Sequence, residues 1–216
     1  PSHPVAQALL KACLPLGVSG VSAPSANRFG RVSPTTAAHV QSELGPDVLI
    51  LDGGECDVGI ESTIVDCTRG EPVLLRPGRI TRTQIEAVCG RAVRGKDDPQ
   101  EVSGQAAPRA SGTLESHYAP RARVRLMSAQ DISAKLQALG PHANNLGLWS
   151  AERPDDGVGA GVLWRAQPQC AEQAAHELFS VLRDLDARGV QQIWAQWPPD
   201  TPEWEGVRDR LQRAAA

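Results

Sequence analysis

The sequence predicts an α/β protein in two parts, a twisted sheet with helices and then a small three-layer α/β domain. In the first part, short apolar runs give way to clusters of small and hydrogen-bonding residues. Farther along, strand-like and helix-like stretches alternate, which is the pattern of a sheet covered by helices. Hydrophobic residues make up 41% of the 216 residues and aromatics only 4%, so the cores are expected to be mostly aliphatic.

The first predicted element is a helix over residues 1–14, because its apolar residues fall on one side. Residues 18–27 mix small and polar side chains and suit a short strand that leads into a loop. Ser33 and Pro34 predict the start of a second helix that runs to about Leu44. Serine is a common N-cap, and proline is favoured at the first helical position.

Three short apolar runs predict strands in the rest of the first part. Residues 48–51 are wholly apolar and end at Asp52, as a buried strand does. Residues 60–65 and 73–75 are the other two strand candidates.

A third helix is predicted after these strands. Thr81 and Gln84 have the spacing of a capping box, and Gly90 is typical of a helix end. Residues 95–116 are rich in Gly, Ser, Ala, Pro and charge, which favours a linker.

The second part alternates between strands and helices. The predicted strands cover residues 124–127, 146–149, 162–164 and 193–197, and the helices cover 129–139, 170–188 and a last segment with Val207 and Leu211. The sequence therefore divides into residues 1–94, a linker over 95–121, and a C-terminal domain over 122–216.

Charge and cysteine content exclude several classes of protein. The net charge of -3 argues against a dedicated nucleic-acid coat protein, whose domain is normally basic. The five cysteines form no C-x-x-C pair, which argues against a disulfide framework or a structural zinc site. No apolar run reaches the length of a membrane span, and no signal peptide is visible, so we expect a cytoplasmic protein with reduced thiols.

Two motifs in the first part carry polar groups suited to a ligand. Ser25 and Asn27 flank Ala26 in an expected turn and offer donors and acceptors for a phosphate or an amino acid. An ordinary turn is the alternative, because both residue types are common in turns. Ser33 is expected at a helix N-terminus, where free N–H groups suit a phosphate, or it serves only as a cap.

Four later residues are further candidates. Ser62 lies in a Glu-Ser-Thr triplet, and a nucleophilic role is disfavoured because no G-x-S-x-G elbow surrounds it. Arg76 precedes Pro77 and offers a permanently charged guanidinium for phosphate oxygens, with a surface salt bridge as the alternative. His117 and Tyr118 lie at the end of the predicted linker, where an aromatic residue can cover an apolar seam between domains.

The order of these motifs resembles the YrdC-type nucleotide-binding domain of threonylcarbamoyl-AMP synthases. The resemblance rests on Ala23–Asn27, Gly59–Asp66 and Leu75–Gly78, and it continues through Ser116–Pro120 as in the longer, two-domain branch of the family. It implies a partial YrdC-like α+β sheet over residues 1–94, a linker that crosses the active site, and a Rossmann-like C-terminal domain.

The resemblance also implies a function. Family members make L-threonylcarbamoyl-AMP from L-threonine, bicarbonate and ATP with release of pyrophosphate, for threonylcarbamoyladenosine in tRNA. ATP is then a substrate, with Mg²⁺ expected on its triphosphate, and tRNA or tRNA-modification proteins are downstream partners. By resemblance, the ATP ligands are Ser25, Ser33, Arg76 and Tyr118, the threonine ligands are Ala23 and Ser62, and further contacts come from Asn27 and His117. It assigns no covalent catalytic residue and no metal ligand.

The family's P-T-E-T-x-Y-G-L-G-type segment and its K-x-R pair do not occur in this sequence. The resemblance implies that further threonine and phosphate ligands lie upstream of Pro1, as in a fragment, a mis-called gene or half of a split protein. A non-catalytic RNA-binding module is an alternative, because residues 76–125 hold ten Lys and Arg against five acidic residues. A carbamoyl-transferring relative is a third interpretation.

Overall fold

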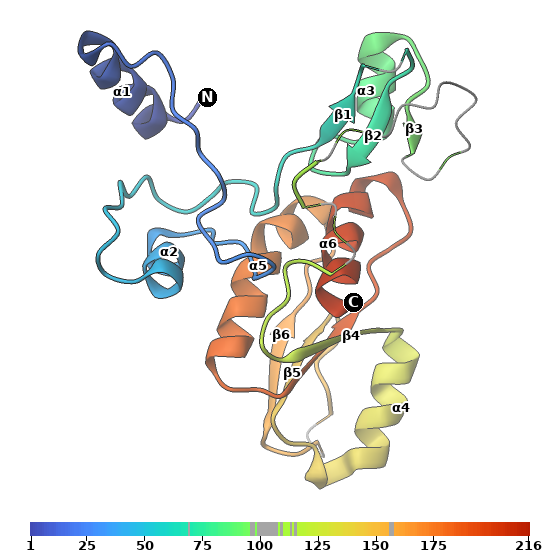
Figure 1. Cartoon of the computed structure of the whole chain (residues 1–216). Coiled ribbons are helices and arrows are strands. Elements are labelled where there is room, and N and C mark those ends of the chain that lie inside the picture. The colour runs from blue at the N-terminus through green and yellow to red at the C-terminus, as the bar shows by residue number, and fades with distance from the viewer. Residues whose placement is uncertain are drawn as a thin grey trace. The chain divides into compact units, whose positions relative to one another are not determined.

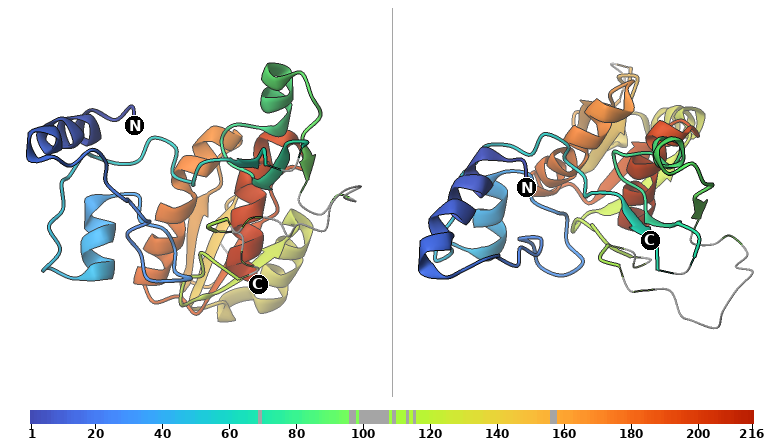
Figure 2. Two further views of the ribbon diagram at one scale, coloured as in Figure 1. Left: turned by 45° about the horizontal axis from the view of Figure 1, so that its top comes forward. Right: turned by 90° about the horizontal axis from the view of Figure 1, so that it is seen from above.

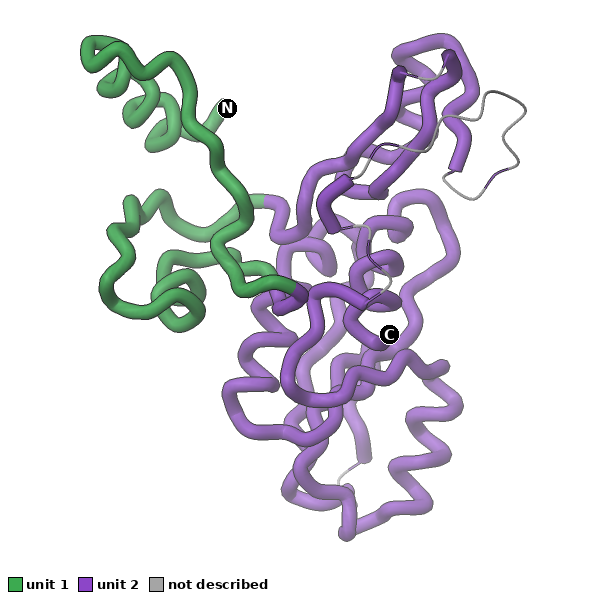
Figure 3. The backbone as a smooth tube through the Cα atoms, in the orientation of Figure 1, with its two compact units in different colours: residues 1–29, 33–57 green, residues 30–32, 58–216 purple. Residues whose placement is uncertain are grey.

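A computed structural model describes residues 1–68, 70–95, 98, 108, 110–112, 114, 116–155 and 158–216. The chain forms two compact units, which Figure 3 colours separately. Unit 1 comprises residues 1–29 and 33–57, and unit 2 comprises residues 30–32 and 58–216. Much of the predicted linker, including Lys96 and Arg109 of the basic stretch, lies outside the described residues.

Unit 1 contains helices α1 (Pro4–Cys13) and α2 (Ala37–Leu44) and the short 3₁₀ helix η1 (Leu14–Leu16). The prediction that Ser33 caps the second helix is wrong, because the N-cap is Thr36. The extended backbone of Thr36 lets its hydroxyl accept a hydrogen bond from the His39 backbone N–H at 3.2 Å. Pro34 therefore lies upstream of the helix and not at its first position.

Two strands predicted in unit 1 do not form. Residues 18–27 and 48–51 have no regular secondary structure, and Leu49 is 90% exposed. A strand needs a neighbour to satisfy its backbone N–H and C=O groups. The described residues of unit 1 contain no strand with which either segment could pair.

Unit 2 begins with a small mixed sheet of three strands in the order β1-β2-β3. Strand β1 (Ile64–Asp66) pairs antiparallel with β2 (Val73–Arg76), and β3 (Arg94–Gly95) pairs parallel with β2. The prediction of strands in 60–65 and 73–75 is confirmed, although β1 begins only at Ile64.

Helix α3 (Arg82–Cys89) follows β2 and forms as predicted. The capping box is present: Thr81 accepts a bond from the Gln84 backbone, and the Gln84 side chain accepts one from the Thr81 backbone. Gly90 ends the helix at a φ of +65°, where a residue without Cβ is favoured.

The C-terminal part of unit 2 is a four-stranded parallel sheet in the order β4-β7-β5-β6. This confirms the predicted alternation of strands and helices. The elements in chain order are β4 (Arg123–Met127), α4 (Ala129–Leu139), η2 (Gly140–His142), β5 (Leu146–Ser150), β6 (Val162–Ala166), α5 (Ala171–Ala187), β7 (Gln192–Gln196), η3 (Pro202–Trp204) and α6 (Glu205–Ala215).

Helices cover both faces of this sheet, with α4 on one face and α5 and α6 on the other (Figures 1 and 2). Successive strand residues point to opposite faces, so neighbours on one strand enter different cores. On β5, Leu148 packs in the core beneath α4, whereas Trp149 packs with α5 and α6. On β7, Trp194 packs in the core beneath α4, and Ile193 packs with α5 and α6.

Two further features agree with the composition. All five cysteines are free thiols. In the part of the chain that the structure describes, no helix is both long and apolar enough to cross a bilayer.

Candidate functional site

A buried arginine on the last helix joins two loops of the small mixed sheet. Arg210 of α6 is 0% exposed. Its Nε donates to Glu61 Oε2 at 2.9 Å, its Nη2 donates to the Glu61 carbonyl at 3.2 Å, and its Nη1 donates to the Pro77 carbonyl at 2.8 Å. A charge taken out of water must be paired and hydrogen-bonded, and these bonds meet that requirement. The C-terminal helix therefore fixes the loops that precede β1 and follow β2.

The next turn of α6 holds the segment that leads into the C-terminal domain. The guanidinium of Arg213 bonds Asp209, with Nε–O distances of 3.0 Å, and donates through Nη1 to the Leu114 carbonyl. The His117 backbone N–H donates to the Arg213 carbonyl at 3.1 Å. Asp209 also accepts from Arg210 Nη1 at 2.8 Å, so one carboxylate serves both arginines.

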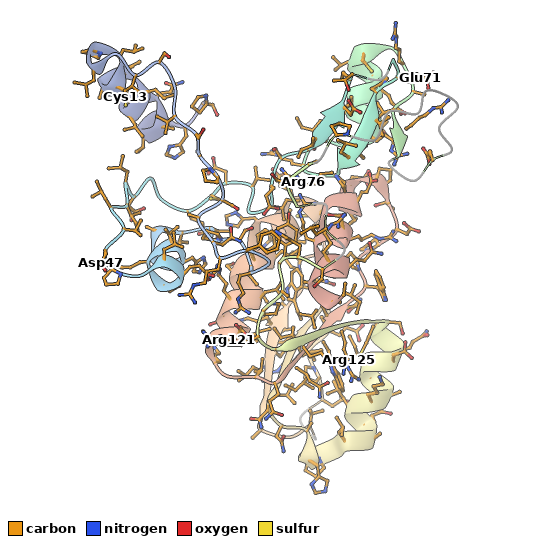
Figure 4. All side chains as sticks on the ribbon, in the orientation of Figure 1. Cys13, Asp47, Glu71, Arg76, Arg121 and Arg125 are labelled. Atoms are coloured by element: carbon orange, nitrogen blue, oxygen red, sulfur yellow. The ribbon has the colours of Figure 1, made fainter. Side chains whose placement is uncertain are left out.

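Arg76, which Figure 4 labels, is the last residue of β2. It is 7% exposed. Its Nε donates to the Ser62 carbonyl at 3.0 Å and its Nη1 donates to the Ser111 carbonyl at 2.8 Å. Its Nη2 lies 3.4 Å from the Ser62 hydroxyl. Burial, and then the positive charge of Arg210, lower the pKa of Arg76, but a guanidinium remains charged in proteins.

Tyr118 packs against Arg210 and is 1% exposed. Its ring centroid is 5.2 Å from that of Phe179, and the guanidinium carbon of Arg210 lies 5.6 Å from the ring centroid. Its φ of +62° is unusual for a residue other than glycine and is held by this packing. Burial, followed by the charge of Glu61, raises the pKa of Tyr118 to about 12, so the phenol keeps its proton.

His117 meets Tyr118 edge to face, with ring centroids 4.1 Å apart. Burial is the largest cause that lowers the pKa of His117. The nearby Glu61 opposes this shift, whereas the positive charges of Arg213, Arg210 and Arg76 add to it. A neutral imidazole is therefore favoured near pH 7.

This group, which we call the arginine cluster, comprises Glu61, Ser62, Arg76, His117, Tyr118, Asp209, Arg210 and Arg213. It combines charged guanidinium groups with the hydroxyl of Ser62, which is an exposed residue. Guanidinium groups bind phosphate and carboxylate oxygens, and a hydroxyl can donate to or accept from a ligand. The arrangement is suited to holding an anionic ligand. The Ser62 hydroxyl is approached by the guanidinium of Arg76, which can donate a hydrogen bond but cannot act as a base.

The structure brings together four of the residues predicted to bind ligands: Ser62, Arg76, His117 and Tyr118. The other four, Ala23, Ser25, Asn27 and Ser33, belong to unit 1. Ala23 and Ser25 are exposed, Asn27 donates through Nδ2 to the Arg28 carbonyl at 3.1 Å, and Ser33 is buried.

Sequence reasoning gave no role to Glu61, Asp209, Arg210 or Arg213. A signal was present, because Asp209 and Arg213 have the i, i+4 spacing that pairs side chains on a helix. Arg210 immediately precedes Leu211, which packs in the core, so a charge enters the buried face of α6. Among the residues that the structure describes, no group of three or more His, Cys, Asp or Glu is placed to hold a metal ion.

Two family models match the chain. Residues 80–216 match the model described as "Threonylcarbamoyl-AMP synthase, C-terminal domain". Residues 1–78 match the model described as "Telomere recombination".

Three curated relatives align over the whole chain. The chain is 36% identical over 225 residues to threonylcarbamoyl-AMP synthase from Bacillus subtilis and covers 61% of it. Identity to the synthase from Schizosaccharomyces pombe is 32% over 233 residues, with 56% of that protein covered. Identity to the synthase from Pyrococcus abyssi is 33% over 230 residues, with 62% covered. The chain thus spans about three fifths of the length of these relatives.

Two solved structures of the Pyrococcus abyssi protein Sua5 are similar to this fold. The complex with L-threonine matches with a TM-score of 0.72 and 31% identity, covering 89% of this chain and 56% of that one. A variant with alanine in place of an adjacent histidine and tyrosine matches with a TM-score of 0.82 and 29% identity, covering 100% of this chain and 61% of that one.

Replacing Arg210 with methionine should destabilise the protein by about 3–5 kcal/mol, because the partly buried carboxylate of Glu61 and the Pro77 carbonyl lose the bonds that Arg210 donates. The matched control is Arg208→Met on the same helix, since Arg208 pairs with the exposed Asp200 and such pairs contribute about 0–1 kcal/mol. Urea unfolding followed by circular dichroism measures both. Equal losses in the two variants would show that Arg210 does not hold the loops.

The lowered pKa of His117 makes stability depend on pH. The folded pKa lies below the unfolded value of about 6.5, so the unfolded state binds the proton more readily. The contribution of His117 is present above the unfolded pKa and is lost as pH falls through it toward the folded pKa. His117→Asn should flatten this decline in urea midpoints between about pH 7 and pH 5.5, whereas His142→Asn, at an exposed residue, should not. The same slope in both variants would contradict the assignment.

Proposed function

Because the chain belongs to the threonylcarbamoyl-AMP synthase family, we propose that it takes part in making L-threonylcarbamoyl-AMP from L-threonine, bicarbonate and ATP. The observation that carries the proposal is alignment of the whole chain to three synthases at 32–36% identity. The arginine cluster adds support, since it places charged guanidinium groups beside an exposed serine. The product supplies threonylcarbamoyladenosine synthesis in tRNA, which makes tRNA or tRNA-modification proteins the downstream partners.

The reaction has two steps. The amine nitrogen of threonine bonds to the carbon of bicarbonate, and loss of water leaves a carbamate. A carbamate oxygen then bonds to the α-phosphorus of ATP while the bond to the β-phosphate oxygen breaks, and pyrophosphate leaves. Such a sequence requires oriented substrates and neutralised phosphate charge, with no covalent bond to the protein. Mg²⁺ enters with the triphosphate, as part of the ATP substrate.

The ligand assignments follow the motifs. The Pyrococcus abyssi protein has been solved in complex with L-threonine. The hydroxyl of Ser62, an exposed residue, suits the threonine side, and the guanidinium of Arg76 suits a phosphate because it stays charged. The proposed ATP ligands are Ser25, Ser33, Arg76 and Tyr118, the threonine ligands are Ala23 and Ser62, and further contacts come from Asn27 and His117.

The finer division of the fold is part of the same proposal. Residues 1–94 are the C-terminal portion of a YrdC-like domain, residues 95–121 the linker, and residues 122–216 a Rossmann-like domain. The two family matches meet between residues 78 and 80, close to the end of β2. Free thiols at all five cysteines are compatible with a cytoplasmic location.

The adjacent His117 and Tyr118 form the only His-Tyr pair in the chain, since Tyr118 is its one tyrosine. A His-Tyr pair was replaced in one of the Pyrococcus abyssi structures. The described packing holds the Tyr118 ring against Phe179 and Arg210. Tyr118 therefore packs against Arg210, which bonds the residues that adjoin Ser62 and Arg76.

Pyrophosphate release from ATP by this chain tests the function. Release is expected only when L-threonine and bicarbonate are both present, because the carbamate must form before the α-phosphorus is attacked. A coupled phosphate assay after pyrophosphatase treatment measures the rate with each substrate omitted in turn. Pyrophosphate release that does not require threonine, or no release with all three substrates present, would contradict the proposal for this chain.

Substitutions at Arg76 and Ser62 separate the two substrates. Arg76→Ala should raise the apparent KM for ATP at least about tenfold with a smaller effect on threonine, because charge-assisted bonds to phosphate are lost. Ser62→Ala should mainly raise the KM for threonine. The control is Arg79→Ala, which removes an exposed ion pair with Glu172 and should change neither KM. Equal effects of Arg76→Ala on both substrates would contradict its role as a phosphate ligand.

A further inference from the structure

A cavity lies within the C-terminal sheet domain, on the face opposite the arginine cluster. It has a volume of about 220 Å³ and opens between α4, the ends of β5 and β7, and the segment that follows β5. Ser150 and Gln196, which line it, are the last residues of β5 and β7. The carboxyl edge of an open parallel sheet is where ligands bind in such folds.

The floor of the cavity is apolar and belongs to the core beneath α4. Ile132 and Leu136 of α4 face Leu148 of β5 across it, and all three are buried. Val158 packs against the same core from the loop side. A short aliphatic group would be excluded from water on this floor.

The segment after β5 is tied down by hydrogen bonds. The Ser150 hydroxyl donates to the Glu152 carbonyl at 2.7 Å and accepts from Trp164 Nε1 at 3.2 Å. The Ala151 backbone N–H donates to the Gln196 side-chain oxygen at 3.0 Å. These bonds fix residues 150–152 of the rim before a ligand binds, which lowers the entropic cost of binding.

The rim of the cavity carries charges of both signs, all from residues 152–155. Glu152, Arg153 and Asp155 are exposed and line the cavity, and the guanidinium carbon of Arg153 lies 6.0 Å from the ring centroid of Trp164. Two carboxylates against one guanidinium disfavour a polyphosphate. The volume is also below the range of about 300–1,000 Å³ usual for larger ligands.

From this combination we infer that the cavity is a binding site for a small aliphatic α-amino acid in its zwitterionic form. Arg153 takes the α-carboxylate, and Glu152 or Asp155 takes the ammonium group. The aliphatic side chain lies on the floor made by Ile132, Leu136 and Leu148. The site is separate from the proposed chemistry, because it lies on the α4 face of the sheet and the arginine cluster is built on α6.

Tryptophan fluorescence of the whole chain can follow binding, since Trp164 lies beside the rim and Trp194 packs in the apolar core below. Titration with L-valine, which lacks the hydroxyl of the proposed substrate threonine, should give a saturable change. Arg153→Ala should raise the dissociation constant for valine at least tenfold by removing the carboxylate partner. Arg121→Ala, which removes an exposed arginine that does not line the cavity, should leave it unchanged.

A second pair of variants tests the cavity itself. Ser133→Leu places a larger side chain on the wall formed by α4 and should abolish the change, whereas Ala134→Leu adds the same group at the next, exposed position outside the lining. Thermal unfolding verifies that each variant is folded. If Ser133→Leu does not fold, Arg153→Ala against Arg121→Ala decides the question.

Three results would overturn the inference: no saturable change with L-valine, a dissociation constant for valine that Arg153→Ala leaves unaltered, or saturation by adenosine alone. The outcome does not depend on pyrophosphate release, so failure of the proposed reaction and failure of this site are distinguishable.

Discussion

The full burial of the Arg210 guanidinium is the constraint on which the rest of unit 2 depends. A buried charge cannot lose its acceptors without a cost of several kcal/mol, so the residues that supply those acceptors are held in place. Glu61 and Pro77 supply them, and each is the immediate neighbour of a residue predicted to bind ligand. The C-terminal helix therefore positions the two loop residues that adjoin Ser62 and Arg76.

The charges of the arginine cluster do not cancel. Three guanidinium groups, from Arg76, Arg210 and Arg213, face the two carboxylates of Glu61 and Asp209. Burial first, and then the positive charge of Arg210, lower the pKa of Arg76, so the two cations repel each other. A bound anion would relieve that repulsion, so the cluster gains most from a phosphate or carboxylate at Arg76. The excess of one positive charge is thus a physical reason for the ligand chemistry that the motifs suggest.

Local sequence patterns predicted most of the helices and strands. They did not predict bonds between residues that are far apart in the sequence. The Thr81 capping box and the alternation from β4 to α6 rest on neighbours in sequence, and both were predicted. The run 48–51 failed as a strand because apolar character alone does not supply a pairing partner. The bond between Arg210 and Glu61 joins residues 149 positions apart, and no periodicity in the sequence reports such a pair. For the same reason, Arg76 and Ser62 were singled out by their motifs while the residues that hold them were missed.

Alternate residues along β5 and β7 face opposite sides of the sheet, so this one sheet contributes both to the core beneath α6 and to the cavity beside α4. Trp149 and Ile193 face α5 and α6, and through that core they support the helix that carries Arg210. Leu148 and Gln196 face α4 and line the cavity at the carboxyl edge. Because alternate residues serve different faces, a substitution on the cavity side can change binding there while the core beneath α6 keeps its packing. The domain can therefore hold the arginine cluster in place and bind a small ligand, with neither role constraining the residues of the other.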